Sequence, residues 1–270
     1  MEKLKNIKCF LLDLDGTVYL SGTVLPGAAE AVARMRKQGK VFFVTNNTPD
    51  SRSSLVKKLR EKGIDSTEDD FYTASNATAD YLNYYHPGKK VCFLGTEAFR
   101  QEFSRYGIQT TDTDPDLVVV AFDTDLNYKS LAKVCGFIRK GVPYLATHPD
   151  INCPTAAGDI PDVGSFLALI EKSTGKSPFI ICGKPFWPMA DGIKKLINCQ
   201  PREIAMIGDR LSTDILFAKS NGFVSVLVLT GEIKSNSIYT NVQPDIVLDS
   251  IALWDAECIR YAGGEYTYEI

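Results

Sequence analysis

Short apolar runs alternate with amphipathic stretches along the first third of the chain. Residues 7–12 and 40–44 are mostly apolar runs of strand length. A run too short for a helix, bounded by a turn signal, is typical of a buried strand in a parallel sheet. Residues 28–38 and 51–62 carry apolar side chains at helical spacing and each is followed by glycine. This order of strand, helix, strand and helix predicts a doubly wound parallel sheet.

A second set of such elements begins at about residue 78. Further strands are expected at 91–94, 117–121, 144–147, 180–182, 203–207, 223–229 and 246–248, a hairpin at 19–26, and helices at 77–85, 97–106, 128–140, 165–173 and 215–221. The sequence therefore predicts an α/β protein. Its doubly wound core comprises residues 1–77 and 178–270, and a smaller α/β unit is inserted at 78–177.

Two carboxylates follow the first strand, in the order Asp13-Leu14-Asp15-Gly16-Thr17. Side chains two apart on a strand share a face, so Asp13 and Asp15 are expected to lie together at its carboxyl end. Open α/β sheets bind their ligands at that edge. Two such acids repel unless a cation lies between them. One could then attack phosphorus while the other handles protons. The alternative is a turn in which Asp-x-Asp-Gly only caps the backbone.

Polar residues also follow three later strands. They are Thr45, Asn46 and Asn47, then Lys184 after Gly183, then Asp209 and Asp214. The first two groups have a plain structural alternative: Thr45, Asn46 and Asn47 can cap the next helix, and Lys184 can be a surface lysine. His148 and Asp150 close the last strand of the inserted unit as an ordinary turn, with His148 a candidate for substrate specificity.

Composition narrows the class of protein without deciding it. The chain has 270 residues, a formal net charge of −3 and no basic stripe, which argues against nucleic acid as the main partner. Its seven cysteines include no Cys-x-x-Cys pair. That pattern favours reduced thiols in a cytoplasmic protein. No apolar stretch approaches the roughly 20 residues that a membrane helix needs.

Taken in order, the four strand-end motifs resemble those of the haloacid dehalogenase superfamily. Within it the chain is similar to the NagD-like, or p-nitrophenyl phosphatase, subfamily with a type C2 cap, and the inserted unit resembles that cap. The ending Val228-Leu229-Thr230-Gly231 belongs to the same resemblance. The resemblance implies a Rossmann-like core and a Mg²⁺-dependent phosphatase that acts through an aspartyl-phosphate.

The resemblance also implies a role for each motif residue. Asp13 is the expected nucleophile, and Asp15 the acid that protonates the leaving group and later activates water. Mg²⁺ is expected on the carboxylates of Asp13 and Asp209 and the main-chain carbonyl of Asp15, with Asp214 supporting the site. Three residues are expected to bind the phosphate: Thr45 and the Asn46 amide hold the phosphoryl group, and Lys184 neutralises it while holding the Asp13 carboxylate. Asn47 is expected nearer the leaving group.

There are two departures from the subfamily pattern. The position after Gly183-Lys184-Pro185 is often small or polar and is Phe186 here, and the cap loop also differs. The loop commonly reads Asn-Pro-Asp and later Pro-Gly-x-Gly, whereas this chain has His148-Pro149-Asp150 and Pro161-Asp162-Val163-Gly164. These changes bear on substrate preference, with His148 and Asp150 as candidate substrate contacts.

The expected partner is a small phosphate ester, with no nucleic acid and no membrane. Homo-oligomer formation through the cap stays open. Two other functions also stay open: a phosphoryl transferase or mutase using the same intermediate, and a non-enzymatic phosphometabolite-binding or receiver protein.

Overall fold

The structure is a computed structural model that describes residues 6–20, 22–46, 50–155, 157–231 and 242–254. The chain divides into two compact units. Unit 1 comprises residues 1–44, 60–65 and 197–270, and unit 2 comprises residues 45–59 and 66–196. The expected boundary at residue 78 falls inside a helix, Ala74–Tyr85. The division into core and cap at 78–177 therefore stays a prediction.

Unit 1 is built on a parallel sheet of buried apolar strands. Its strands are β1 (Cys9–Leu12), β4 (Lys40–Thr45), β11 (Ile204–Gly208), β12 (Val224–Val228) and β13 (Ile246–Leu248). They run in the order β13-β12-β11-β1-β4. Strand β5 (Phe71–Thr73) belongs to unit 2. All residues of β1, β11 and β12 are buried, as expected for strands covered on both faces.

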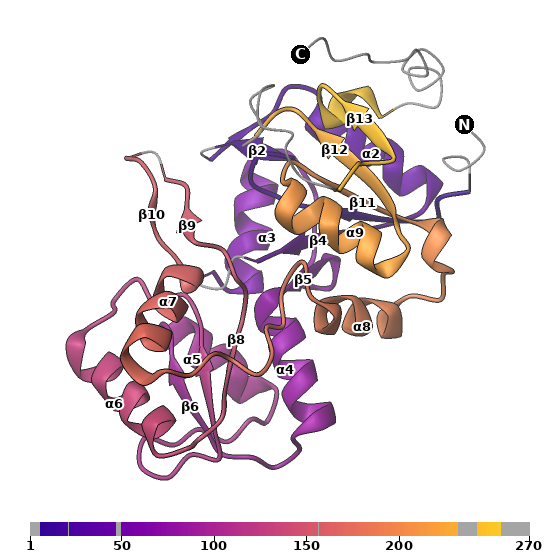
Figure 1. Cartoon of the computed structure of the whole chain (residues 1–270). Helices are drawn as coiled ribbons and strands as arrows, with labels where there is room; N and C mark the ends of the chain where they lie inside the picture. The colour runs from indigo at the N-terminus through magenta and orange to yellow at the C-terminus, as the bar shows by residue number, and fades with distance from the viewer. Residues whose placement is uncertain (1–5, 21, 47–49, 156, 232–241, 255–270) are drawn as a thin grey trace. The chain divides into compact units, whose positions relative to one another are not determined.

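Two crossover helices connect these strands. Helix α2 (Ala28–Gln38) leads from β1 to β4, and α9 (Leu216–Asn221) leads from β11 to β12. Figure 1 shows α9 beside β11 and β12. The two crossovers move along the sheet in opposite directions from the adjacent strands β1 and β11. Right-handed crossovers then place their helices on opposite faces. The β1/β11 boundary is thus the topological switch point, where ligands bind in open α/β sheets.

Unit 2 contains a second parallel sheet, in the order β6-β7-β8. Its strands are β6 (Val91–Leu94), β7 (Leu117–Val120) and β8 (Tyr144–Ala146), and its helices include α5 (Glu97–Arg105), α6 (Tyr128–Arg139) and α7 (Val163–Thr174). Strands β6 and β7, with helices α6 and α7, enclose an apolar core. Phe122, Phe166 and Ile170 belong to this core.

Helix α4 (Ala74–Tyr85) packs against α8 (Trp187–Leu196) in the same unit. A Cβ added at Gly192 of α8 would overlap the Tyr72 hydroxyl, which explains why glycine stands inside a helix. Unit 2 also holds the residues of α3 (Arg52–Glu61) up to Leu59 and the antiparallel pair β9 (Asn152–Cys153) and β10 (Ile160–Pro161).

Most expected elements are present, including the hairpin formed by β2 (Tyr19–Leu20) and β3 (Thr23–Val24). The expected strand at 180–182 is wrong, because only an isolated bridge between Ala146 and Ile181 forms there. Helix α8 and strand β5 were not expected. Helix α8 was not expected because Pro188 and Gly192 both lower helix propensity. Strand β5 has three residues, which are too few to show a strand period. Among the described helices, none combines the length and apolar character needed to cross a membrane.

Candidate active site

The acidic motif begins where β1 leaves the sheet at the switch point. The main-chain N–H of Asp13 still donates to the Ile207 carbonyl of β11, at 2.9 Å. The ladder between the two strands therefore extends one residue past β1 and holds the Asp13 backbone. Asp13 is 9% exposed, so its carboxylate is largely shielded from solvent.

Gly16 then turns the chain sharply. It has φ +85°, a conformation that strains residues with a Cβ. Its N–H donates to the Tyr19 carbonyl at 2.7 Å, and its own carbonyl accepts from Thr230 Oγ1 at 2.5 Å. A Cβ added to Gly16 or to Gly231 would overlap the Asp209 carboxylate. Two glycines thus make the space in which this carboxylate lies.

Asp209 and Asp214 come from the turn that follows β11. Residues Leu211–Ile215 form a π-helical turn, a distortion found frequently at functional sites. The Arg210 N–H donates to Asp214 Oδ2 at 3.1 Å, and a Cβ at Gly208 would overlap the Asp214 carboxyl group. The turn therefore folds the fully buried Asp214 back over the end of β11.

The carboxylates of Asp13, Asp209 and Asp214 come together at the switch point. One oxygen from each lies within 4.8 Å of the others. Three acids so close repel one another, and a bound cation relieves that repulsion. Hard carboxylate oxygens suit Mg²⁺, which is commonly bound through one or two of them together with waters and substrate phosphate. This acidic cluster, with the glycine-lined space around Asp209, fits a magnesium ion.

In unit 2, the side chain of Asn46 pairs with the main chain of Lys184. Asn46 Nδ2 donates to the Lys184 carbonyl at 3.0 Å, and the Lys184 N–H donates to Asn46 Oδ1 at 2.9 Å. Asn46 is 5% and Lys184 2% exposed, so both bonds are shielded from water. The pair fixes the Lys184 backbone beside the residue that follows β4.

The segment before Lys184 lies along β8. The Cys182 N–H donates to the Ala146 carbonyl at 3.0 Å, and the Gly183 N–H donates to the Thr147 carbonyl at 2.6 Å. A Cβ at Gly183 would lie 2.6 Å from Asn46 Oδ1, so glycine is needed for this approach. Burial raises the pKa of the Cys182 thiol to about 12. This cysteine therefore stays protonated at neutral pH and is not a nucleophile.

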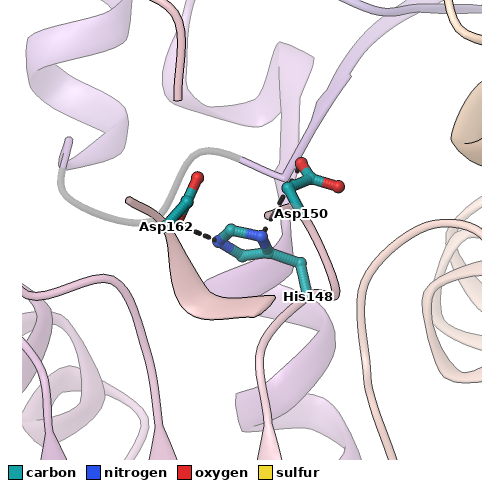
Figure 2. Close-up of side chains that lie close together, drawn as sticks. All are labelled: His148, Asp150 and Asp162. Atoms are coloured by element: carbon teal, nitrogen blue, oxygen red, sulfur yellow. Dashed lines mark ion pairs between the residues drawn. The ribbon is translucent and has the colours of Figure 1, made fainter. Parts of the chain in front are cut away.

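His148 lies between two carboxylates, as Figure 2 shows. Its Nδ1 is 3.6 Å from Asp150 Oδ2, and its Nε2 is 3.6 Å from Asp162 Oδ1. The Asp150 carboxylate also accepts from Asn46 Nδ2, at 3.3 Å to each oxygen. A network of polar contacts thus runs from Asp162 to Lys184 inside unit 2.

Comparisons with known proteins agree with this arrangement. A sequence profile of haloacid dehalogenase-like hydrolases matches residues 10–109, and a HAD-hydrolase-like profile matches residues 181–254. The 5'-nucleotidase YutF of Bacillus subtilis is 31% identical over 253 residues, which cover 93% of this chain and 98% of the relative. The chain belongs to the haloacid dehalogenase superfamily. The sugar-phosphatase AraL of the same organism is 33% identical over 246 residues, covering 89% of each chain.

Solved structures identify the subfamily of this haloacid dehalogenase. A 4-nitrophenylphosphatase from Thermotoga maritima superposes with a TM-score of 0.89 and 38% identity, covering 93% of this chain and 97% of the other. NagD from E. coli K-12 superposes with a TM-score of 0.85 and 30% identity, covering 92% and 98%. The chain is thus a NagD-like phosphatase, with the fold expected from its sequence.

The structure groups the predicted site residues of this phosphatase into two sets. The first comprises Asp13, Asp209 and Asp214; the second comprises Asn46, His148, Asp150 and Lys184. Their assigned roles stay predictions, as do those of Asp15 and Thr45. Asn47 lies outside the described residues.

Sequence reasoning gave no site role to Asp162 and Gly231, two residues that lie against these groups. Asp162 precedes an apolar run, which is the signal of a helix N-cap, and it does cap α7. No local pattern could have shown that Gly231 lies against Asp209, because that contact joins two separate turns.

Proposed function

We propose that this phosphatase hydrolyses small phosphate monoesters with Mg²⁺, through a phosphorylated Asp13. The observation that carries the proposal is the acidic cluster of Asp13, Asp209 and Asp214 at the switch point of the sheet. Phosphoryl transfer asks a protein mainly for alignment and charge neutralisation. A buried carboxylate beside a cation site meets both needs.

The reaction proceeds in two displacements. In the first, a carboxylate oxygen of Asp13 forms a bond to phosphorus while the ester P–O bond breaks, and Asp15 gives its proton to the leaving alkoxide. In the second, water attacks phosphorus, Asp15 takes a proton from that water, and the bond to Asp13 breaks. Free phosphate and the unmodified carboxylate result.

Asp13, Asp209 and Asp214 would hold the magnesium ion, with the Asp15 carbonyl as a further ligand. When bound, Mg²⁺ lowers the repulsion between the Asp13 carboxylate and the anionic substrate. In the proposal, Thr45 and the Asn46 main-chain N–H bind the phosphoryl oxygens and Lys184 neutralises their charge. The joint site of Asp13 and Lys184 that the sequence predicts stays a prediction.

The substrate class is a small phosphorylated metabolite. The relatives above are named for sugar phosphates, nucleotides and 4-nitrophenyl phosphate, so the names favour phosphatase activity over the transferase and receiver alternatives without selecting one ester. A cytoplasmic location and pairing of two copies through the cap stay predictions.

A phosphate-release screen tests the proposal. The protein is incubated with Mg²⁺ and a panel of sugar phosphates, nucleoside monophosphates and 4-nitrophenyl phosphate, and free phosphate is measured. Release from at least one ester is expected. Phosphate that appears only on an acceptor would identify a transferase, and no turnover of any ester would contradict the proposal.

Two variants test the covalent route. Asp13→Asn removes the nucleophile and is expected to abolish turnover, with the circular dichroism spectrum unchanged. Asp15→Asn should leave the first displacement of a good leaving group largely intact and slow the second, giving a burst of about one nitrophenolate per enzyme. An active Asp13→Asn variant would exclude the aspartyl-phosphate.

A further inference from the structure

The imidazole of His148 fills the space between two carboxylates of unit 2. It is 1% exposed, and within the described structure neither ring nitrogen has a hydrogen-bond partner. Instead, each nitrogen faces one carboxylate oxygen at 3.6 Å, Asp150 at Nδ1 and Asp162 at Nε2. We call these three residues the His148 clamp (Figure 2).

A metal ion is the other occupant to consider, because one ligand atom of each of these residues lies within 4.8 Å of the others. However, Figure 2 shows the two carboxylates at different nitrogens of the ring. A metal ion binds a single imidazole nitrogen. The arrangement therefore fits a ring that links the two carboxylates better than an ion that all three residues share.

The Asp162 end of the clamp is fixed to a helix. Asp162 caps α7, and its Oδ1 accepts from the Val163 N–H at 2.6 Å. Val163, Phe166 and Ile170 of this helix are buried in the apolar core of unit 2. Moving Asp162 would disturb that packing, so this end is a rigid anchor.

The Asp150 end reaches the residues assigned to phosphate binding. The Asp150 carboxylate accepts from Asn46 Nδ2, and Asn46 pairs with the main chain of Lys184. The Asp150 carbonyl accepts from the Gly164 N–H at 2.7 Å, which ties its backbone to the first turn of α7. The Asp150 side chain contacts both Asn46 and His148.

We propose that His148 is a positioning residue that holds Asp150 against Asn46 and so fixes Lys184. In this proposal α7 holds Asp162, and the contacts from His148 through Asp150 and Asn46 hold the Lys184 backbone in place. His148 itself does not touch the substrate. This inference rests on the proposed function, in which Lys184 neutralises the phosphoryl group. It assigns the cap-loop histidine to support rather than to substrate contact.

A double-mutant cycle with His148→Gln and Asp150→Asn tests the proposal, with kcat and KM measured for 4-nitrophenyl phosphate in Mg²⁺. Each single variant should lower kcat/KM by roughly tenfold, because losing a supporting group lets the residue that it holds move out of place. The double variant should be no worse than Asp150→Asn alone, since His148 acts through Asp150. If the double variant instead shows the product of the two single-variant losses in kcat/KM, the clamp is wrong.

Two further variants separate the clamp from simple packing. In His148→Asn the side-chain amide takes the place of Nδ1 and can donate to Asp150, so more activity should survive than in His148→Gln. His86→Gln changes the other of the two histidines and is the matched control, with kcat/KM unchanged. Equal losses in His148→Asn and His148→Gln would contradict the proposal.

Hydrogen exchange gives a readout that does not depend on activity. The Lys184 N–H donates to Asn46 Oδ1, so His148→Gln should speed its exchange while the amides of β7 stay protected. An unchanged Lys184 amide would overturn the clamp. Zn²⁺ bound by the wild type and lost in His148→Gln would also overturn it, in favour of a metal site. A protein that hydrolyses no ester but shows the faster exchange would refute the proposed function and leave the clamp standing.

Discussion

Gly16 lies so close to Asp209 that a Cβ at position 16 would overlap the Asp209 carboxylate. The two residues belong to turns after different strands, β1 and β11, and Gly16 also needs its positive φ of 85°. One glycine therefore has a conformational role and a spatial role, and the two can be separated by experiment.

Gly16→Ala should lower both stability and activity. The positive φ costs roughly 1 kcal/mol for a residue with a Cβ, and the added methyl group displaces the Asp209 carboxylate from the acidic cluster. The activity loss should therefore exceed what the loss of folded protein explains, as measured by thermal melting and kcat at a temperature where the variant is folded.

Gly22→Ala is the matched control, because Gly22 has φ +82° but nothing within 4 Å of an added Cβ. It should show a similar loss of stability with normal kcat. If the two variants have the same kcat, the contact between Gly16 and Asp209 has no role in the reaction.

Metal removal should abolish activity reversibly. EDTA is expected to stop hydrolysis and added Mg²⁺ to restore it, because Asp13, Asp209 and Asp214 form the proposed ion site. Asp209→Asn should raise the Mg²⁺ concentration for half-maximal activity by at least the roughly 10–100-fold lost with outer-shell partners of metal ligands.

Asp249→Asn is its control, since Asp249 is exposed and also follows a strand of unit 1, β13. This variant should respond to Mg²⁺ as the wild type does. Hydrolysis that continues unchanged in EDTA would exclude the metal assignment.

The buried Glu102 should make stability depend on pH. It is 5% exposed, and burial raises the pKa of its carboxyl above the ordinary 4.5, although the Arg52 guanidinium, 3.5 Å away, acts in the opposite direction. The folded state therefore binds the proton of the Glu102 carboxyl more tightly than the unfolded state does. The stabilisation is complete below pH 4.5 and is lost as the pH rises through the folded-state pKa.

Glu102→Gln removes this dependence. Denaturant unfolding between pH 4 and pH 8 should show that the wild type loses stability relative to the variant as the pH rises. Parallel curves for the two proteins would show that the Glu102 pKa is the same in the folded and unfolded states.

Limited proteolysis can test the predicted insertion at 78–177. Residues 175–177 are exposed and include Lys176, whereas Asn76 is buried in the first turn of α4. Proteinase K, which is not restricted to basic residues, should therefore cut at residues 175–177 before it cuts near residue 76, because nicking needs exposed and mobile backbone. Mass spectrometry of the first fragments identifies the site, and early cleavage inside β7 would contradict a compact unit.

Local patterns predicted the elements far better than the contacts between them. Buried strands such as β6 could be bounded from their apolar run alone, because parallel strands covered on both faces are uniformly apolar. The Ile180–Cys182 run was interpreted in the same way, but in the described part of the chain it pairs with β8 alone, through an isolated bridge. Sequence periodicity does not show how many neighbours a run will have.

The candidate site shows the same limit. The polar residues that follow the strands were enough to group Asp13 with Asp209, since parallel strands present their carboxyl ends at one edge of the sheet. The partners of Asn46 could not be found in this way. Its contacts with Lys184 and Asp150 are 138 and 104 residues apart in sequence, and they depend on packing in unit 2 that no local signal encodes.

The pairing of Asn46 with Lys184 also constrains how this position can change in evolution. The amide both gives and receives a hydrogen bond with the peptide groups of Lys184. Aspartate would lack the donor, and glutamine would be one methylene too long for a glycine-tight approach. We therefore expect asparagine to persist here even in descendants that have lost phosphatase activity, because it holds the structure together and not only the reaction.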